Sequence, residues 1–446
     1  MNTTDIVCPS CKANLIHEDG SYTCPQCTTT YKTRDGIPIF TLSDEYWCNV
    51  DKQKMHELIA DAEESGDWFE ASKRHIPDYM RAYEFLYRAD AQFIFPINSQ
   101  SIVLDAGSMW GGLTVPIAQY CKEIVALDKT WETLRLLKTR ATQMGINNIT
   151  PIVSPIHKLP FPDNHFDLVM LNGVLEWLGM EQDVVLDEHW DNKRKDTYVH
   201  KMDPRQMQLE ALIELHRVCK PNGSIYVAIE NRIGVQYFFG HPDDHMNVRF
   251  TTFMPRWYAN IVTKFFRNAE YRTYVYTPHQ LSQLVQDADF KNSKMFSVYP
   301  HYGKISRLTP FIIFNSVKRV ATEGYAHIAV LLMTKVWRLF PSKMCKNISP
   351  SIALIANAGL ENDNPPRLIG MLMEADIIGK TDIGRYELMM ANYRFGNGHS
   401  INYVIFDKNL KKLTYFCKIS RRKGDRALKV ESENLQKVSL ALSEQA

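Results

Sequence analysis

Four cysteines near the N-terminus constrain the fold of this chain more than any other feature. They form two C-x-x-C pairs, and they are Cys8, Cys11, Cys24 and Cys27. Two such pairs place four thiolates at tetrahedral reach and leave no position for water or substrate, which is typical of a structural Zn²⁺ site. A disulfide pairing or a redox-active C-x-x-C is the alternative. Because residues 1–42 are too few to bury a sufficient apolar core, we expect the metal to supply their folding energy.

The rest of the composition indicates a globular protein with several domains. The chain has 446 residues, of which 45% are hydrophobic, and a formal net charge of +2. This near-neutral charge and the lack of a long basic run argue against a dedicated nucleic-acid-binding protein. The other cysteines are scattered and odd in number, as expected of thiols in a reducing cytosol, and the first residues have no signal-peptide pattern. We therefore expect a cytoplasmic protein.

One apolar stretch, from Ile328 to Phe340, bears on membrane contact. It is too short to cross a bilayer, and it contains Lys335 and Arg338. We interpret it as a core-facing helix, with a helix on a membrane surface as the alternative. Any contact with a membrane is therefore expected to be peripheral at most.

Residues 101–128 predict a nucleotide-binding unit. A short buried strand at 101–105 runs into a glycine-rich turn at 106–112, and a helix at 113–120 leads to a second strand that ends at Asp128. This is the strand–helix–strand unit of a nucleotide-binding sheet. The glycines permit close approach of the backbone to a ligand, and Asp128 is placed to accept hydrogen bonds from two ribose hydroxyls. An α/β domain with a glycine-rich turn and no nucleotide is the alternative.

The pattern of buried strands and amphipathic helices continues along the chain. Helices are expected at 206–219 and 277–287, the second with Thr277 as its N-cap. Further strands are expected at 152–154, 168–171, 224–230, 294–299 and 351–356, of which 294–299 has the character of an edge strand.

Four stretches together resemble the class I S-adenosylmethionine-dependent methyltransferases over residues 75–360. They are LDAGSMWGGLT, VALD, KLPFPDNHFDLVMLNGVLEW and RVCKPNGSIYVAIENR. The resemblance implies an α/β fold with a seven-stranded Rossmann-like sheet, in which the strand at 351–356 runs antiparallel to its neighbour. The N-terminal cysteine segment, 1–42, resembles the small zinc ribbons that precede some bacterial methyltransferases, and a helical linker at 43–74 would join the two.

The same resemblance implies S-adenosylmethionine as the cofactor and assigns residues to it. The glycine-rich loop would lie under its methionine and ribose, Asp128 would hold the ribose, the segment after Pro155 would flank the adenine, and the end of the fourth strand would approach the sulfonium. The implied residues are Asp105, Gly107, Ser108, Gly111, Asp128, Ile156, Asn172 and Gly173. Two positions depart from the family pattern: Met109 replaces the middle glycine, and Pro155 replaces an aspartate. A non-catalytic scaffold is therefore an alternative.

An insertion at 231–277 is expected to cover the substrate, and a second insertion lies at 300–350. Ligands of open α/β sheets bind beyond the carboxyl ends of the strands, and the first insertion starts at such an end. We expect this insertion to supply the base that removes a proton from a hydroxyl or amine acceptor. The alternatives for the same residues are a metal site or a simple polar turn. The candidates are His241, Asp243, Asp244 and His245. Glu176 and Glu230, at strand ends, remain further candidates.

The acceptor itself is indicated only by resemblance. Similar lids with ENRxG and YRTYxY stretches occur in methyltransferases of surface polysaccharide assembly, which implies a glycan or its carrier, with a hydroxyl, phosphate or amine as acceptor group. An RNA or a translation component is the alternative, and the near-neutral charge disfavours it. The lid arginines Arg232, Arg249, Arg256 and Arg272 would clamp an anion or hold the lid down, and Trp257, Tyr258 and Tyr274 are interpreted as core residues.

The C-terminal segment, 365–446, is expected to form a small separate α+β domain. Strands are predicted at 386–393, 400–406 and 412–419. Lys418 with Glu431 on a following helix resembles the small lobe of kinase-like phosphotransferases, but no catalytic Asp-Asn loop follows, so phosphoryl transfer is not expected. A β-rich docking domain is the alternative, and either this domain or the zinc ribbon would bind a partner protein.

Overall fold

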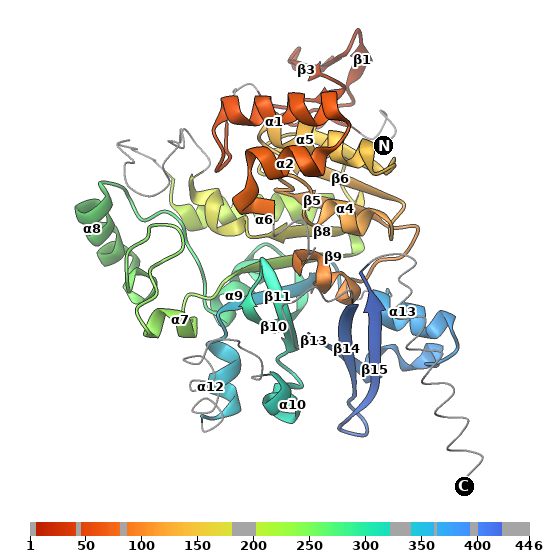
Figure 1. Ribbon diagram of the computed structural model, residues 1–446, viewed down its shortest axis with the longest axis vertical. Helices are drawn as coiled ribbons and strands as arrows, with labels where there is room; N and C mark the ends of the chain where they lie inside the picture. Colours follow the sequence, from red (N-terminus) through yellow and green to blue (C-terminus); the bar gives the residue numbers. More distant parts are fainter. Residues whose placement is uncertain are drawn as a thin grey trace.

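The computed structural model describes residues 6–41, 46–80, 87–180, 202–321, 340–360, 364–392 and 400–421. These residues form a small N-terminal sheet and one large sheet with helices on both of its faces (Figure 1). The predicted apolar stretch 328–340, apart from Phe340, and Glu431 lie outside the described residues, so neither prediction is tested. Among the described residues, no helix is long and apolar enough to cross a membrane.

Five parallel strands form the centre of the large sheet. In spatial order they are β7 (Ile149–Val153), β6 (Glu123–Asp128), β5 (Ile102–Ala106), β8 (Phe166–Asn172) and β9 (Cys219–Glu230). Their residues are mostly buried, because helices cover both faces and each strand is a nearly continuous apolar run. The strands predicted in this part of the chain are confirmed.

Two antiparallel strands extend this centre to seven. β12 (Ser351–Asn357) lies between β9 and β10 (Lys291–His301) and runs antiparallel to both. The reversed strand predicted at 351–356 is thus confirmed. The edge character predicted for 294–299 is wrong, because β11 (Lys304–Pro310) folds back on β10 through a hairpin and covers its free side.

Within the described residues the sheet has eleven strands, rather than the seven predicted. β11, which comes from the predicted second insertion, pairs with β13 (Tyr386–Ala391), and the sheet continues through β14 (Ser400–Asp407) and β15 (Lys412–Ser420). The described strands of the C-terminal segment therefore continue the main sheet instead of building a sheet of their own. Tyr403 strengthens this junction, because its hydroxyl donates to the carbonyl of Asp90 at 2.6 Å.

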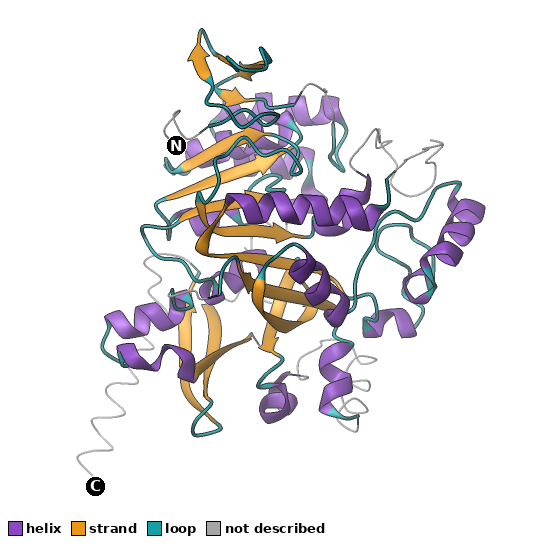
Figure 2. Cartoon of the chain, turned by 180° about the vertical axis from the view of Figure 1, so that it is seen from behind, coloured by secondary structure: helices purple, strands orange, loops and turns teal. Residues whose placement is uncertain are grey.

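Helices cover the two faces of the sheet (Figure 2), and the two faces carry different clusters of apolar residues. Alternate strand residues point to opposite faces, so Leu104 joins one cluster and Val103 the other. The predicted N-cap is present, because Thr277 forms a capping box with Gln280. A second cap, not predicted, is Asp203, which accepts from the backbone of Gln206. The longer helices are α1 (Lys52–Ser65), α5 (Trp131–Gln143), α6 (Pro204–Val218), α8 (Arg256–Arg267) and α9 (Pro278–Asp287), and the shorter ones are α2 (Trp68–His75), α4 (Thr114–Ala118), α7 (Val235–Phe238), α10 (Phe314–Ala321), α12 (Ser342–Asn347) and α13 (Arg367–Glu374).

The N-terminal cysteine module is a four-stranded antiparallel sheet that is docked on the large one. Its strands are β1 (Ile16–Glu18), β2 (Ser21–Thr23), β3 (Thr30–Arg34) and β4 (Ile37–Pro38). After β4, Ile39 bridges Val153 of β7 in parallel, and the backbone N–H of Phe40 donates to the Val153 carbonyl at 2.7 Å. A salt bridge of 2.7 Å between Lys12 and Glu214 adds a second attachment. The module is thus joined to the edge of the sheet by direct pairing.

The segment predicted as a linker packs on the core as well. α1 and α2 both contact α5, and Met55 and Leu58 of α1 share an apolar cluster with Trp110 and Leu136. The N-terminal part of the chain therefore continues the surface of the α/β core over one side of the sheet, from the cysteine module to α2.

Candidate active site

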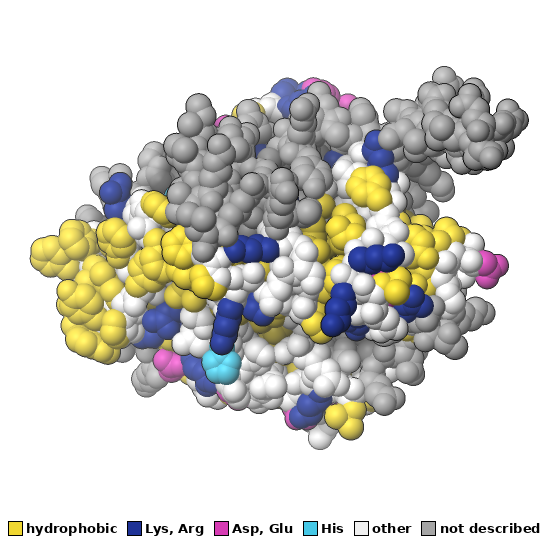
Figure 3. Space-filling view, turned by 90° about the horizontal axis from the view of Figure 1, so that it is seen from below, with side chains coloured by type: hydrophobic (Ala, Val, Ile, Leu, Met, Phe, Trp, Pro, Cys, Tyr) yellow, Lys and Arg dark blue, Asp and Glu magenta, His cyan; other side chains and the backbone are white. Residues whose placement is uncertain are grey.

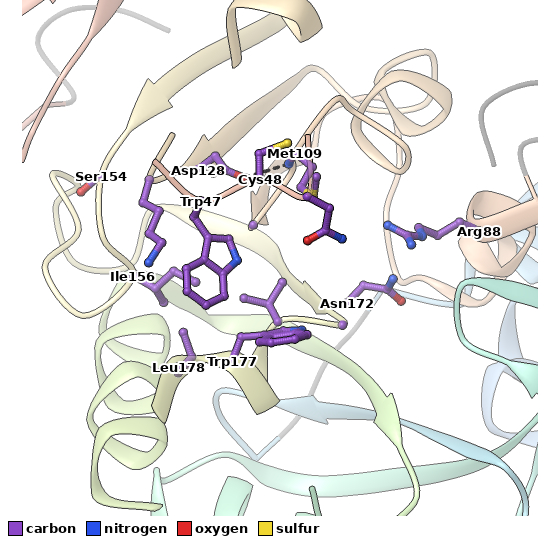
Figure 4. Close-up of a pocket in the computed structure, with 15 residues that line it drawn as sticks. Trp47, Cys48, Arg88, Met109, Asp128, Ser154, Ile156, Asn172, Trp177 and Leu178 are labelled. Atoms are coloured by element: carbon purple, nitrogen blue, oxygen red, sulfur yellow. Dashed lines mark hydrogen bonds between the residues drawn. The ribbon is translucent and has the colours of Figure 1, made fainter. Parts of the chain in front are cut away.

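A pocket opens at the carboxyl ends of β5, β6 and β8, where ligands of open α/β sheets bind (Figure 4). It collects five of the eight residues predicted to bind a cofactor. These are Gly107, Asp128, Ile156, Asn172 and Gly173. These five residues come from four separate turns. The fold therefore brings together residues that are spread over some seventy positions of the sequence.

The glycine-rich turn forms one wall of the pocket. Gly107 has φ of +84°, and a Cβ at this position would lie 2.4 Å from the Cγ2 atom of Val174, so only glycine fits. Met109, which stands where the family has glycine, also has a left-handed φ of +46° and lines the pocket. A left-handed conformation costs a non-glycine residue about 1–2 kcal/mol, so the backbone keeps the glycine geometry against the preference of methionine.

Three predicted cofactor residues are not in the pocket lining; they support the turn from behind. Asp105 is buried and accepts a 2.6 Å hydrogen bond from Thr114 Oγ1, and its burial raises its pKa to about 6. The Ser108 side chain is buried, and its backbone N–H donates to the Leu127 carbonyl at 3.0 Å. Gly111, with φ of +79°, lies close to the side chain of Leu137.

Asp128 ends β6 and offers a carboxylate to the pocket. Its Oδ2 atom accepts from the backbone N–H of Met109 at 2.9 Å, and Oδ1 accepts from that of Thr130 at 3.1 Å. Burial raises the pKa of this carboxyl, and the two backbone donors act against that shift. Each carboxylate oxygen can accept a further hydrogen bond, so the geometry fits a ligand diol such as a ribose.

Asn172 is the last residue of β8, and its side chain is the best indication of a missing ligand. It is 7% exposed, and neither its amide nitrogen nor its amide oxygen has a hydrogen-bond partner in the structure. A buried amide is almost always hydrogen-bonded, so a polar ligand group is expected here. The next residue, Gly173, has φ of +70°, and a Cβ there would clash with the ring of Tyr302 at 2.4 Å.

Sequence reasoning missed the wall that the N-terminal segment provides. Trp47 follows the cysteine module, and its backbone N–H and carbonyl both bond to the hydroxyl of Thr130, at 2.9 and 3.1 Å. Its ring faces that of Trp177 edge-on, with 5.7 Å between the centroids, and the ammonium of Lys129 lies 4.3 Å from its centre. No sequence pattern relates Trp47 to a loop more than eighty residues away.

Behind Trp177 lies a buried cluster of two carboxylates and a histidine. Glu176 follows β8, Glu230 ends β9, and His245 comes from the lid; one side-chain ligand atom of each lies within 4.8 Å of the others. His245 Nε2 is 3.4 Å from Glu230 Oε2, an ion-pair distance without hydrogen-bond geometry. The Tyr302 hydroxyl donates to Glu176 at 3.2 Å, and His301 Nε2 lies 3.3 Å from Glu230 on the other side.

Electrostatics divide the cluster into an ion pair and a neutral acid. Burial alone would lower the pKa of His245, but Glu230 and other carboxylates outweigh it and raise that pKa to about 10. Burial likewise opposes ionisation of Glu230, yet His245 and His301 hold the pKa of its carboxyl well below the usual range. Burial and the charge of Glu230 raise the pKa of Glu176. The protonated imidazole of His245 therefore faces an ionised Glu230, while burial and the neighbouring charge favour the neutral form of Glu176.

Of the four catalytic candidates from the lid, the structure brings only His245 to the cluster. Asp243 caps the turn, accepting from the backbone N–H groups of His245 at 3.0 Å and Met246 at 2.6 Å. Asp244 is exposed and accepts from the Tyr237 hydroxyl at 2.7 Å. His241 is also exposed, with Nδ1 2.9 Å from the Pro242 carbonyl. These three form a polar turn that presents His245.

Most of the lid arginines hold the lid in place. Arg232 donates to the carbonyls of Thr252 and Met254, both at 2.9 Å, and Arg272 donates to those of Gly179 and Met202. The predicted core positions of Trp257 and Tyr258 are wrong, because these side chains are 68% and 44% exposed.

The four N-terminal cysteines converge as a metal site requires. Cys8 Sγ lies 3.6 Å from Cys27 Sγ, Cys11 Sγ lies 3.4 Å from Cys24 Sγ, and all four sulfur atoms are within 4.8 Å of one another. None of them forms a disulfide. A closed set of four thiolates fits a tetrahedral Zn²⁺ ion.

Comparison with known proteins gives the class of the central domain. Residues 104–195 match the family model described as "Methyltransferase domain". An uncharacterised methyltransferase of Schizosaccharomyces pombe is 33% identical over 132 residues, which are 28% of this chain and 37% of that protein. The chain thus matches little more than a third of the length of this relative.

Solved structures show more distant similarity. A chain from the complex between the Haloferax volcanii Trm112 methyltransferase activator and a methyltransferase is 13% identical, with a TM-score of 0.37, over 68% of this chain and 98% of the other. Phosphoethanolamine N-methyltransferase 2 of Haemonchus contortus is 13% identical, with a TM-score of 0.35, over 69% and 60%. The family match identifies residues 104–195 as a methyltransferase domain, of the class that uses S-adenosylmethionine.

Proposed function

We propose that this chain transfers a methyl group from S-adenosylmethionine to an acceptor that enters beneath the lid. The proposal rests on the buried cluster of Glu176, Glu230 and His245. The cluster lies next to Trp177, a residue of the pocket lining whose ring contacts that of His245. Methyl transfer needs a positioned acceptor, exclusion of water and, for a hydroxyl or amine, a group that takes a proton. Pocket and cluster together supply all three.

Each residue has a distinct task in this proposal. The cofactor, when bound, supplies a methyl group that its sulfonium already activates. Asp128 accepts hydrogen bonds from the ribose, and the side-chain amide of Asn172 hydrogen-bonds to a polar group of the ligand. The rings of Trp47 and Trp177 exclude water from the pocket. Glu230, as the ionised carboxylate of the cluster, takes up the acceptor proton, and His245 and His301 on either side of it hold the carboxylate in position.

The acceptor we propose is a glycan or its carrier in surface polysaccharide assembly, in the cytoplasm. The lid stretches that resemble such enzymes support this choice. An RNA acceptor is disfavoured because the net charge is only +2, far from the basic surface that phosphate contacts require.

The cysteine module is proposed to hold one structural Zn²⁺ through Cys8, Cys11, Cys24 and Cys27. The module leads directly into Trp47, so the metal would fix one wall of the cofactor pocket as well as the fold of the module. A partner protein bound by the module or by the C-terminal strands remains a further proposal.

Calorimetry with S-adenosylhomocysteine tests cofactor binding first. Replacing Asp128 with alanine removes charge-assisted hydrogen bonds worth roughly 1.5–3 kcal/mol, so Asp128→Ala should raise the dissociation constant at least about tenfold. Asp244→Ala, which removes an exposed carboxylate of the lid, is the matched control and should bind normally. A wild-type chain that does not bind would support a non-catalytic scaffold, consistent with Met109 and Pro155.

Methyl transfer is then tested with tritiated S-adenosylmethionine and two acceptors, a nucleotide sugar and a prenyl-linked oligosaccharide. Glu230→Gln should lower turnover about 10²–10⁴-fold, the usual contribution of a general base, and leave S-adenosylhomocysteine affinity nearly unchanged. Full turnover in Glu230→Gln would place the base elsewhere.

A further inference from the structure

Helix α8 of the lid exposes the face that a surface helix normally buries. Its inward positions Ala259 and Thr263 are fully buried and small. On the outside, Trp257 is 68% exposed, Ile261 56% and Phe265 82%. A surface helix of a globular protein usually directs such large apolar side chains towards the core. In α8 they point to the solvent instead.

Neighbouring segments enlarge this apolar surface. Phe238 and Phe239, at the end of α7, are 55% and 68% exposed, and Phe250 is 47% exposed although its φ of +66° is unfavourable for a bulky residue. Figure 1 places α7 and α8 together at the edge of the molecule, and hydrophobic side chains cover the same edge in Figure 3. Large contiguous apolar patches of this kind mark binding surfaces.

Polar contacts fix α8 in this orientation. Arg267 donates to the carbonyls of Met246 at 2.9 Å and Asn247 at 2.7 Å, and Asn260 Oδ1 accepts from the backbone N–H of Tyr271 at 3.0 Å. A rotation that buried the aromatic face would break these bonds. The lid is thus built to present its apolar side outward.

We infer that α8 and the end of α7 bind the surface of an anionic lipid bilayer. Helices that lie in the headgroup region combine Trp, Phe and Leu-type side chains on one face with Lys and Arg around them. Residues 246–269 contain four basic residues, Arg249, Arg256, Lys264 and Arg267, and no acidic residue. Among these four, only Lys264 has an ion-pair partner in the described part of the chain, Glu270 at 2.9 Å, so the segment keeps a positive charge that complements anionic headgroups.

The same charges argue against a second copy of the chain as the occupant. A two-fold interface brings equivalent patches together, so the basic residues around α8 would face their own copies. Juxtaposed like charges weaken such an interface. A bilayer supplies both the apolar layer for Trp257 and Phe265 and the opposite charge for Arg249.

Vesicle sedimentation of the full-length chain tests this inference. Vesicles of phosphatidylcholine with phosphatidylglycerol should bind the protein, and vesicles of phosphatidylcholine alone should bind it much less. A triple variant, Trp257→Ser with Phe265→Ser and Phe266→Ser, should bind anionic vesicles at least about tenfold less. Arg249→Gln should weaken binding by about fivefold, the equivalent of one surface charge, and added salt should reduce that difference.

A matched control comes from the other end of the sheet. Leu410, Leu413 and Phe416 in the β14–β15 hairpin are 52%, 42% and 63% exposed, so their triple replacement by serine removes a second set of exposed apolar side chains without touching the lid. This control should bind vesicles normally, and both triple variants should keep wild-type S-adenosylhomocysteine affinity and melting temperature.

Three results would overturn the inference. The first is a wild-type chain that sediments with neither vesicle. The second is vesicle binding that survives the α8 triple variant. The third is a dimer in light scattering that the α8 variant converts to monomer while vesicle binding is absent, which would make the patch a self-association surface.

Discussion

The cysteine module and the lid are both additions to the α/β core, but they treat their apolar residues in opposite ways. The module buries Tyr31 and Phe40 against the α/β core at 4% and 3% exposure, and it pairs with strand β7. The lid contributes His245 to the buried cluster yet leaves Phe265 at 82% exposure. The first addition thus behaves as part of the core, and the second as a surface that awaits a partner.

The difference follows from how each addition is held. The cysteine module has too few residues to form a hydrophobic core of its own. Metal coordination and docking on the large sheet therefore both stabilise its fold. The lid is held by arginine bonds to backbone carbonyls and by one buried ion pair. Such polar attachments fix its orientation without burying its aromatic residues, which leaves these free to bind another surface.

The largest expected effect is on the module side. We expect one Zn²⁺ per purified chain, and Cys24→Ser should lose it, because a three-thiolate site cannot close the tetrahedron. Structural zinc contributes an apparent binding energy on the order of 10 kcal/mol, so the module should unfold. S-adenosylhomocysteine affinity should fall with it, since Trp47, which lines the pocket, would then be held only by its two hydrogen bonds to Thr130. Metal analysis, circular dichroism and calorimetry measure the three consequences.

Cys417→Ser is the matched control for that variant, because Cys417 is a half-buried thiol in β15, remote from the cluster. It should keep both the metal and the ligand affinity. A Cys24→Ser chain that remains folded at its N-terminus without metal would show that docking alone holds the module, and the comparison with the lid would lose its basis.

An intermediate effect is expected from the ion pair that ties the lid to the core. The pKa of His245 is raised from about 6.5 to about 10, so its contribution to stability is fully present below pH 6.5 and is lost as the pH rises towards 10. The pKa of Glu230 is lowered, so its contribution is present above its unfolded value near 4.5 and is lost on acidification. Removing one partner of a buried pair costs about 3–5 kcal/mol.

Denaturant unfolding of wild type and His245→Gln at several pH values measures this contribution. The difference in unfolding free energy should be largest between about pH 4.5 and 6.5 and should shrink towards pH 10. His241→Gln replaces an exposed histidine of the same turn and is the matched control, with an unfolding free energy expected to stay near that of the wild type. A difference that stays constant across this range would mean that His245 is neutral in the folded protein.

Sequence and structure agree where the signal is local. The strands around Asp105 and Asp128 are continuous apolar runs, and the cysteine spacing alone brings four sulfur atoms together. The pairing of β11 with β13 joins segments some eighty residues apart, and neither strand has a sequence feature that identifies the strand it pairs with. The positions 176, 230 and 245 likewise meet only because two strand ends and one turn converge. The aromatic residues of the lid were predicted to be core residues because they are apolar. Composition does not show which face of α8 packs against the protein, so this prediction failed.

The smallest expected effect is on the apolar face of the lid, and it separates the two regions most directly. Phe265→Ala removes a ring that is 82% exposed, so the free energy of unfolding should change by no more than about 0.5 kcal/mol. Phe40→Ala, the matched change at 3% exposure beneath the cysteine module, should cost about 3–5 kcal/mol, because it empties a packed site. Chemical denaturation of both variants gives the comparison. A loss of more than about 2 kcal/mol in Phe265→Ala would mean that the ring is packed in solution, and α8 would then be a core helix rather than a binding surface.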